Sequence, residues 1–221
     1  MTLSEKLFEQ LCNSRQIRFE PILRVSGQQT ADYRIWLADA ETIVEVKQIE
    51  RSEHEIKLIA SGEDEESPAV ISDIQTRIRN KFDKAKTQLK SLSGGKLHTI
   101  LVIYDNTSGL SGMDNEAFMN AMQGDEVIEL TLERKTRKVV RTVHTYGSKN
   151  RKVGQNHNRT VSALGRLLLN ESGHPMLFLF HNEFSTNSLP MEAGSLIAAK
   201  QFVRPPSQDN GYRQWTETSD R

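Results

Sequence analysis

The 221-residue chain has a single cysteine and no long apolar segment. Cys12 alone forms no internal disulfide and completes no Cys/His zinc cluster, which favours a reducing, cytoplasmic compartment. The longest apolar run, Met176 to Phe180, is far too short to span a bilayer, and charged residues near the start take the place of an apolar signal core. We therefore expect neither secretion nor a membrane partner.

The chain also lacks an excess of either charge. Lys plus Arg and Asp plus Glu both number 29, so the formal charge is zero and no global field attracts nucleic acid. Any such partner must be bound by local patches. The hydrophobic fraction of 36% is enough for a real core, and we expect one domain over residues 1–203 followed by a polar tail, 204–221.

The first hundred residues carry clear structural patterns. Leucines at positions 3, 7 and 11 predict a helix, for which Ser4 is the expected cap, with Cys12 packed near its apolar stripe. Strands are expected over 19–25, 32–37 and 42–49, and the short link between the last two requires antiparallel pairing. The polar and acidic stretch 50–68 predicts an exposed loop or lid.

A long helix and a buried strand are expected next. Apolar residues recur every three or four positions from Ile71 to Leu92, and Gly94-Gly95 ends the pattern. The continuous apolar run Thr99 to Tyr104 is typical of a strand covered on both faces. Strand, helix and buried strand together predict a parallel crossover.

The second half is less regular. One hairpin is expected over 127–146 within a basic region, 125–160, and another over 160–182, each of which extends or caps the sheet. The predicted fold class is α/β, with a central mixed sheet built on an antiparallel meander over the core, 1–105. Tyr212 or Trp215 is the residue expected to hold the polar tail against the rest.

Two acids and a lysine form the most informative pattern. Glu45-Val46-Lys47 lies in a predicted strand whose hairpin partner begins with Asp32. Glu55 and Glu133 are also followed two positions later by lysine, but without such a partner. Asp32 and Glu45 would repel one another unless a hard cation lay between them, and Mg²⁺ favours one or two carboxylates with water and phosphate oxygens. Lys47 can then orient the attacking water or neutralise a phosphate.

This arrangement resembles the PD-(D/E)XK nucleases, the restriction-endonuclease-like superfamily, including Holliday junction resolvase-like members, over roughly residues 1–105. The resemblance is carried by four segments: Phe8-Glu9, Ala31-Asp32-Tyr33, Glu45-Val46-Lys47, and Lys84 to Leu89. Ala31 replaces the usual proline.

The resemblance implies Mg²⁺-dependent cleavage of DNA, with Mn²⁺ able to substitute. Asp32 and Glu45 would be the ligands and Lys47 the catalytic base or phosphate contact, while Glu9 and Gln88 would join the site. Glu9 is equally well explained as an exposed helix residue.

Several cations are candidates for nucleic-acid contact. Arg77, Lys81 and Lys84 form a stripe with Gln88 on the long helix, for which the plainer explanation is a solvated face. Residues 134–159 contain nine basic residues and no acid, and from this segment we select Arg151, Lys152 and Arg159.

Three functions remain open: a metal-dependent deoxyribonuclease, a catalytically inactive nuclease-fold protein that binds nucleic acid or takes part in assembly, and a metal-dependent phosphoesterase acting on a small substrate. Proteins of this fold often dimerise, so a homodimer is a further possibility.

Overall fold

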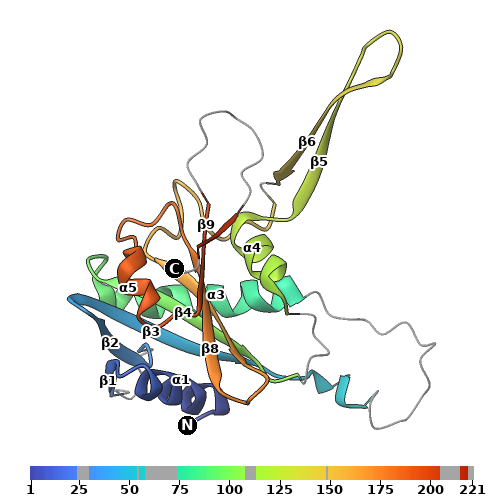
Figure 1. Ribbon diagram of the computed structural model, residues 1–221. Helices are drawn as coiled ribbons and strands as arrows, with labels where there is room; N and C mark the ends of the chain where they lie inside the picture. Colours follow the sequence, from blue (N-terminus) through green and yellow to red (C-terminus); the bar gives the residue numbers. More distant parts are fainter. Residues whose placement is uncertain are drawn as a thin grey trace.

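A computed structural model describes residues 1–23, 30–53, 55–57, 74–107, 113–147, 149–204 and 215–218, without the side chains of 143–145. Most of the strands form one eight-stranded mixed sheet in the order β1-β2-β3-β4-β7-β8-β9-β10 (Figure 1). The predicted α/β class with a mixed central sheet is confirmed. Among the described residues, no helix has the length and apolarity needed to cross a membrane.

The first part of the sheet is the expected meander and crossover. Strands β1 (Arg18–Pro21), β2 (Tyr33–Leu37) and β3 (Ala40–Ile49) pair antiparallel, in that order. Helix α3 (Ile74–Ser93) then leads to β4 (His98–Asp105), which pairs parallel to β3. The strand expected over 19–25 is shorter than predicted within the described chain, and most of the predicted loop or lid, like the start of the predicted helix at Ile71, lies outside the described residues.

The first helix, α1 (Leu3–Ser14), begins one position before the expected cap. Thr2 is the N-cap: its hydroxyl accepts from the Glu5 N–H at 3.2 Å, and Glu5 accepts from the Thr2 N–H at 2.6 Å. The prediction of Ser4 as the cap is therefore wrong. Ser4 is buried inside the first turn, and its N–H donates to Oε1 of Gln48 on β3 at 2.9 Å.

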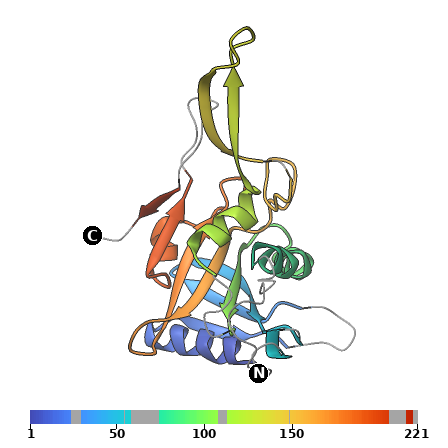
Figure 2. The same ribbon diagram turned by 90° about the vertical axis from the view of Figure 1, so that its right-hand side faces the viewer.

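The second half departs further from expectation. Strands β7 (Ala163–Leu169) and β8 (Pro175–His181) form the predicted hairpin and extend the sheet beside β4. Strands β5 (Glu126–Leu132) and β6 (Val139–Tyr146) form a separate ribbon, which projects from the rest of the chain (Figures 1 and 2). This hairpin therefore neither extends nor caps the sheet.

Four further elements were not predicted from the sequence. They are helix α4 (Asn115–Gln123), helix α5 (Met191–Ser195), strand β9 (Lys200–Val203) and strand β10 (Thr216–Thr218). Strand β9 pairs parallel to β8, and β10 pairs antiparallel to β9. Trp215 packs edge-on against Phe180, which confirms its expected role, while Tyr212 lies outside the described residues.

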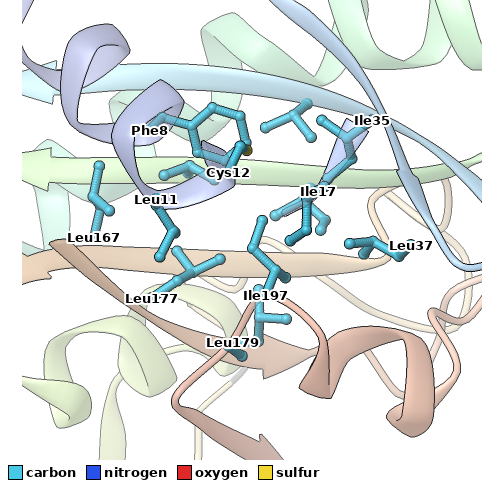
Figure 3. Packing of buried hydrophobic residues seen from close by; sticks show 14 of the residues in the cluster. Phe8, Leu11, Cys12, Ile17, Ile35, Leu37, Leu167, Leu177, Leu179 and Ile197 are labelled. Carbon is cyan, nitrogen blue, oxygen red and sulfur yellow. The ribbon is translucent and has the colours of Figure 1, made fainter. Parts of the chain in front are cut away.

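Each face of the sheet has its own core. On one face, α1 and α5 pack against the strands, and Figure 3 shows Leu11 of α1 beside Leu177 of β8, with Phe8 and Cys12 in the same cluster. On the other face lie α3 and α4, whose apolar side chains join Ile43 and Ile49 of β3. Cys12 is buried as predicted, and burial, followed by the nearby Glu9, raises the pKa of its thiol to about 12. Strand β3 is thus enclosed between two layers of helices.

A substitution of Phe180 tests whether the second half of the sheet shares the core formed with α3 and α4. Its ring is fully buried and stacks on Phe202 at 4.8 Å and on Phe118 at 5.1 Å between ring centroids. We expect Phe180→Ala to lower the free energy of unfolding by about 3 to 5 kcal/mol, as measured by chemical denaturation. The control is Leu130→Ala on the projecting ribbon, where the side chain is 56% exposed and the change should stay within about 0.5 kcal/mol. Equal losses for the two variants would contradict this description of the core.

Candidate functional site

The pairing of β2 with β3 brings Asp32 to Glu45. Tyr33 lies opposite Val44, and the ladder continues one step further because the Asp32 N–H donates to the Val44 carbonyl at 3.2 Å. The Asp32 carboxylate is fixed by the N–H of Val46, which donates to Oδ2 at 2.9 Å. Both acids therefore occupy neighbouring positions where the two strands meet.

Glu45 is the most constrained charged group of the site. Its side chain is completely buried, and its Oε1 accepts a hydrogen bond from Nζ of Lys47, whose side chain is one-quarter exposed. Its Oε2 is buried and accepts no hydrogen bond from the described residues. Burial, followed by the charge of Asp32, raises the pKa of the Glu45 carboxyl to about 7, against the opposing effect of Lys47. A buried carboxylate oxygen without a donor, beside a second carboxylate, is an environment that favours a proton or a cation.

The stripe of α3 faces this site. Lys47, at alternate positions with Ile43 and Ile49, lies on the sheet face that α3 covers. The pKa of Lys81 is lowered, chiefly by partial burial and then by the positive charges of Lys84 and Lys47. Gln88 donates from Nε2 to the carbonyl of Thr30 at 3.0 Å, which ties α3 to the segment just before Asp32. Lys81, Lys84 and Gln88 thus border the predicted site.

Arg77 lies at the start of the same helix but is paired within the protein. Its guanidinium donates to Oε2 of Glu55 at 2.7 Å and to the carbonyl of Glu50 at 3.3 Å. The bond from Arg77 is the main reason that the pKa of Glu55 is lowered to about 2. This pairing gives Arg77 a structural partner in the described chain.

Glu9 lies in the other layer and is bonded to Tyr33, the residue that follows Asp32. Its Oε1 accepts from the Tyr33 hydroxyl at 2.9 Å, and Tyr33 packs in the core cluster of α1, on the sheet face opposite the one that α3 covers. Burial and the bond to Glu9 raise the pKa of Tyr33, and the charges of Glu5 and Asp32 add to this. Glu9 is therefore bonded to the residue next to Asp32, from the face opposite the one that carries Lys47.

A cavity of about 310 Å³ lies beside Glu9, Asp32 and Tyr33. Its lining includes Glu5, Glu9, Asp32 and Tyr33. Glu5 and Tyr33 were not predicted as site residues. The spacing of Glu5 and Glu9, one helical turn apart, was the available signal for Glu5, but the sequence does not show that α1 turns this side toward β2.

The basic residues selected from the second half are hydrogen bonded within the fold. Arg151 donates to the carbonyls of Gln123 at 2.8 Å and Tyr146 at 3.2 Å. Lys152 bonds to Oδ2 of Asp83 at 2.5 Å, and Nε of Arg159 donates to the carbonyl of Phe184 at 3.1 Å. The structure does not bring these three cations to Glu45. Exposed cations of the segment also lie at the tip of the β5–β6 ribbon, at positions 134, 135, 137 and 138.

Comparison with protein-family models, with curated proteins and with solved structures finds no match. Within the described part of the chain, no three His, Cys, Asp or Glu side chains gather in a group able to hold a metal ion. Asp32 and Glu45 are a pair, which is within the one or two carboxylates that Mg²⁺ takes when water and phosphate complete its shell.

The raised pKa of Glu45 predicts a pH dependence of stability. Between the ordinary pKa of 4.5 and the folded value of about 7, the folded state keeps a proton that the unfolded state releases. Stability should therefore be highest below this window and fall by roughly 3 kcal/mol as pH rises through it, measured in EDTA by denaturant unfolding. Glu45→Gln should remove this part of the pH dependence. The matched variant Glu41→Gln, on the same strand, should retain it, and identical profiles for all three proteins would contradict the prediction.

Proposed function

We propose that this protein hydrolyses phosphodiester bonds in DNA with the help of Mg²⁺, for which Mn²⁺ can substitute. The observation that carries the proposal is the buried Glu45 carboxylate, which has one oxygen without a donor, lies next to Asp32 and is bonded to Lys47. The resemblance of these residues to the PD-(D/E)XK pattern supports the same reaction.

Asp32 and Glu45 are the residues that would hold the cation. Two adjacent carboxylates in a buried site are favourable only when a positive charge or a proton compensates them, and the pKa of Glu45 reflects this. A bound Mg²⁺ would supply Lewis acidity toward the phosphate oxygens and lower the pKa of water. The backbone N–H of Val46 and the ammonium of Lys47 orient the two carboxylates in advance.

The lysines provide the remaining chemistry. Lys47 lies at the exposed side of Glu45, where its ammonium can orient the attacking water or contact the scissile phosphate. Lys81 and Lys84 add positive charge at the border of the site, where a phosphate backbone would approach. In the reaction, the water oxygen forms a bond to phosphorus, the bond from phosphorus to one ester oxygen breaks, and the proton lost by water is balanced by the one gained by the leaving alcohol.

A cleavage assay tests the proposal. Linear, circular, single-stranded and branched DNA are incubated with purified protein in Mg²⁺, Mn²⁺ or EDTA. We expect cleavage in either metal and none in EDTA, and a decrease of about 10² or more for Glu45→Ala and for Lys47→Ala, because each removes a group that acts on the reacting centre.

The controls for this assay come from the same hairpin. Arg34 and Glu41 form an ion pair across β2 and β3 at 3.1 Å, on partly exposed side chains. Arg34→Ala and Glu41→Ala should cleave at the wild-type rate. Cleavage that persists undiminished in Glu45→Ala and Lys47→Ala, or that is equal in EDTA, would contradict the proposed chemistry.

The projecting ribbon favours a second candidate, a catalytically inactive nuclease-fold protein that binds nucleic acid or takes part in assembly. The ribbon exposes cations at its tip and aliphatic side chains along its length, including Ile128, Leu130 and Val140. A two-stranded β-ribbon has dimensions that fit the major groove of DNA. Binding of DNA without cleavage in any metal would favour this candidate over hydrolysis.

We expect the ribbon tip to contribute to DNA binding under either candidate. Arg134→Ala with Lys135→Ala should weaken binding to duplex DNA several-fold at low salt, with no loss of thermal stability, because both residues are exposed and lie outside the core. Arg151→Ala, in contrast, should lower thermal stability because two carbonyls lose their donor. Fluorescence anisotropy and thermal melts provide the two measurements, and unchanged affinity of the tip variant would exclude the ribbon from the binding surface.

A further inference from the structure

A cleft of about 480 Å³, lined by residues with polar side chains, lies between the C-terminal half of α3 and the loop that precedes β7. The volume falls in the range of about 300 to 1,000 Å³ that is usual for small-ligand sites. The described residues that line it include no acid and no Phe, Tyr or Trp. They are Lys86, Thr87, Lys90, Asn156, His157, Asn158, Arg159 and Thr160.

The loop side of this cleft is held rigidly although it contains no helix or strand. The Thr160 carbonyl accepts from the Thr99 hydroxyl at 2.6 Å, and the Arg159 carbonyl accepts from the Thr186 N–H at 2.8 Å. The ion pair between Lys152 and Asp83 joins the start of the loop to α3. Both walls of the cleft are therefore fixed before any ligand binds, which reduces the entropic cost of binding.

Gly154 sets the position of the His157 side chain. The two residues form a backbone bridge, with N···O distances of 3.2 and 3.3 Å. A Cβ added at Gly154 would lie 2.6 Å from Cε1 of the His157 ring. The imidazole thus packs directly on the glycine backbone, and a larger residue at 154 would displace it.

Positive groups in the cleft remain available to a ligand. The ammonium of Lys90 has no hydrogen bond or ion pair within the described part of the chain. Arg159 donates through Nε to Phe184, so its two terminal nitrogens remain available on an exposed side chain. Lys86 pairs with Asp83 at 2.9 Å, on side chains that are both 38% exposed.

The chemistry of these groups fits a phosphate. Guanidinium and ammonium groups, with amide and hydroxyl groups beside them, match the several acceptor oxygens of a phosphate group. His157 supplies the one aromatic ring among the lining residues, against the three cations Lys86, Lys90 and Arg159. A backbone phosphate is therefore a better occupant than a base.

The cleft also lies across α3 from the candidate site. Gln88 and Lys90 are two positions apart, so they point to nearly opposite sides of the helix. Gln88 contacts the segment before Asp32, whereas Lys90 lines the cleft. The two sides of α3 are separated by about the helix diameter of 10 to 12 Å, which corresponds to roughly three base-pair steps along a DNA strand.

We propose that this cleft is a phosphate-binding subsite that holds the nucleic-acid backbone at a distance from the scissile bond. The inference rests on the proposed function for the choice of DNA as the source of the phosphate. A free nucleotide presents the same chemistry, and the experiment separates the two sources.

The main test uses Lys90→Ala combined with Arg159→Ala. Binding of a labelled DNA duplex is measured in EDTA over a series of salt concentrations, so that no cleavage is required. The slope of log affinity against log salt should become less steep by about 1.8, because each phosphate contact contributes about 0.9. The control combines Lys6→Ala, on α1, with Arg15→Ala, at its C-cap; both cations are exposed, and this variant should keep the wild-type slope. An unchanged slope in a Lys90/Arg159 variant that melts like the wild type would overturn the proposal.

A second measurement monitors the loop directly. Inorganic phosphate and a deoxynucleoside monophosphate are titrated separately in EDTA, and the amide resonances of residues 154–160 are recorded by NMR. We expect saturable shifts with inorganic phosphate that are lost in the double variant and reduced in Gly154→Ala, which keeps every charge. Absence of shifts, together with an unchanged duplex slope, would overturn the site. A mononucleotide that binds far more tightly than phosphate, with an unchanged duplex slope, would overturn the assignment to a nucleic-acid backbone.

The two proposals fail separately in these experiments. Lack of cleavage by wild-type protein in Mg²⁺, with a changed slope in the double variant, would reject hydrolysis and retain the subsite. Cleavage that depends on Glu45, with an unchanged slope in the double variant, would retain hydrolysis and reject the subsite.

Discussion

Strand β3 is paired on both edges and covered on both faces, and the arrangement of the rest of the sheet depends on this constraint. It is antiparallel to β2 and parallel to β4, with α1 packed over one face and α3 over the other. A charged residue in such a strand has little access to water, so Glu45 retains its charge only through Lys47 or another cation. The burial of β3 that stabilises the sheet is therefore also the cause of the unusual chemistry of the Glu45 carboxyl.

The sequence predicts the first half of the fold because its signals are local. The short link between β2 and β3, the helical periodicity from Ile78 to Leu89, and the apolar strand that follows each specify their own conformation. Helix α4 has weaker signals, since it is short and its N-cap, Asp114, follows a stretch without periodicity. Strands β9 and β10 have only four and three residues, and the pairing of β9 to β8 and of β10 to β9 depends on contacts distant in sequence.

The candidate site, like the fold, has a part that the sequence predicts and a part that it does not. Asp32, Glu45 and Lys47 could be placed together because strand pairing and two-residue alternation are geometric rules. The participation of Tyr33 depends on the angle at which α1 crosses the sheet, which no local pattern encodes. The cations of the second half were selected by charge alone, and charge does not distinguish Arg151, which bonds to two carbonyls, from Lys135 at an exposed tip.

The β5–β6 ribbon and the eight-stranded sheet differ in their expected stability. Within the described part of the chain the two strands of the ribbon pair only with each other, and its connection to the rest includes the ion pair between buried Arg79 of α3 and Asp125 at its base. A lone two-stranded ribbon is marginally stable in water. It can therefore open and close while the eight-stranded sheet stays folded, so that one chain contains a rigid body and an arm with its own, much smaller, barrier to disorder.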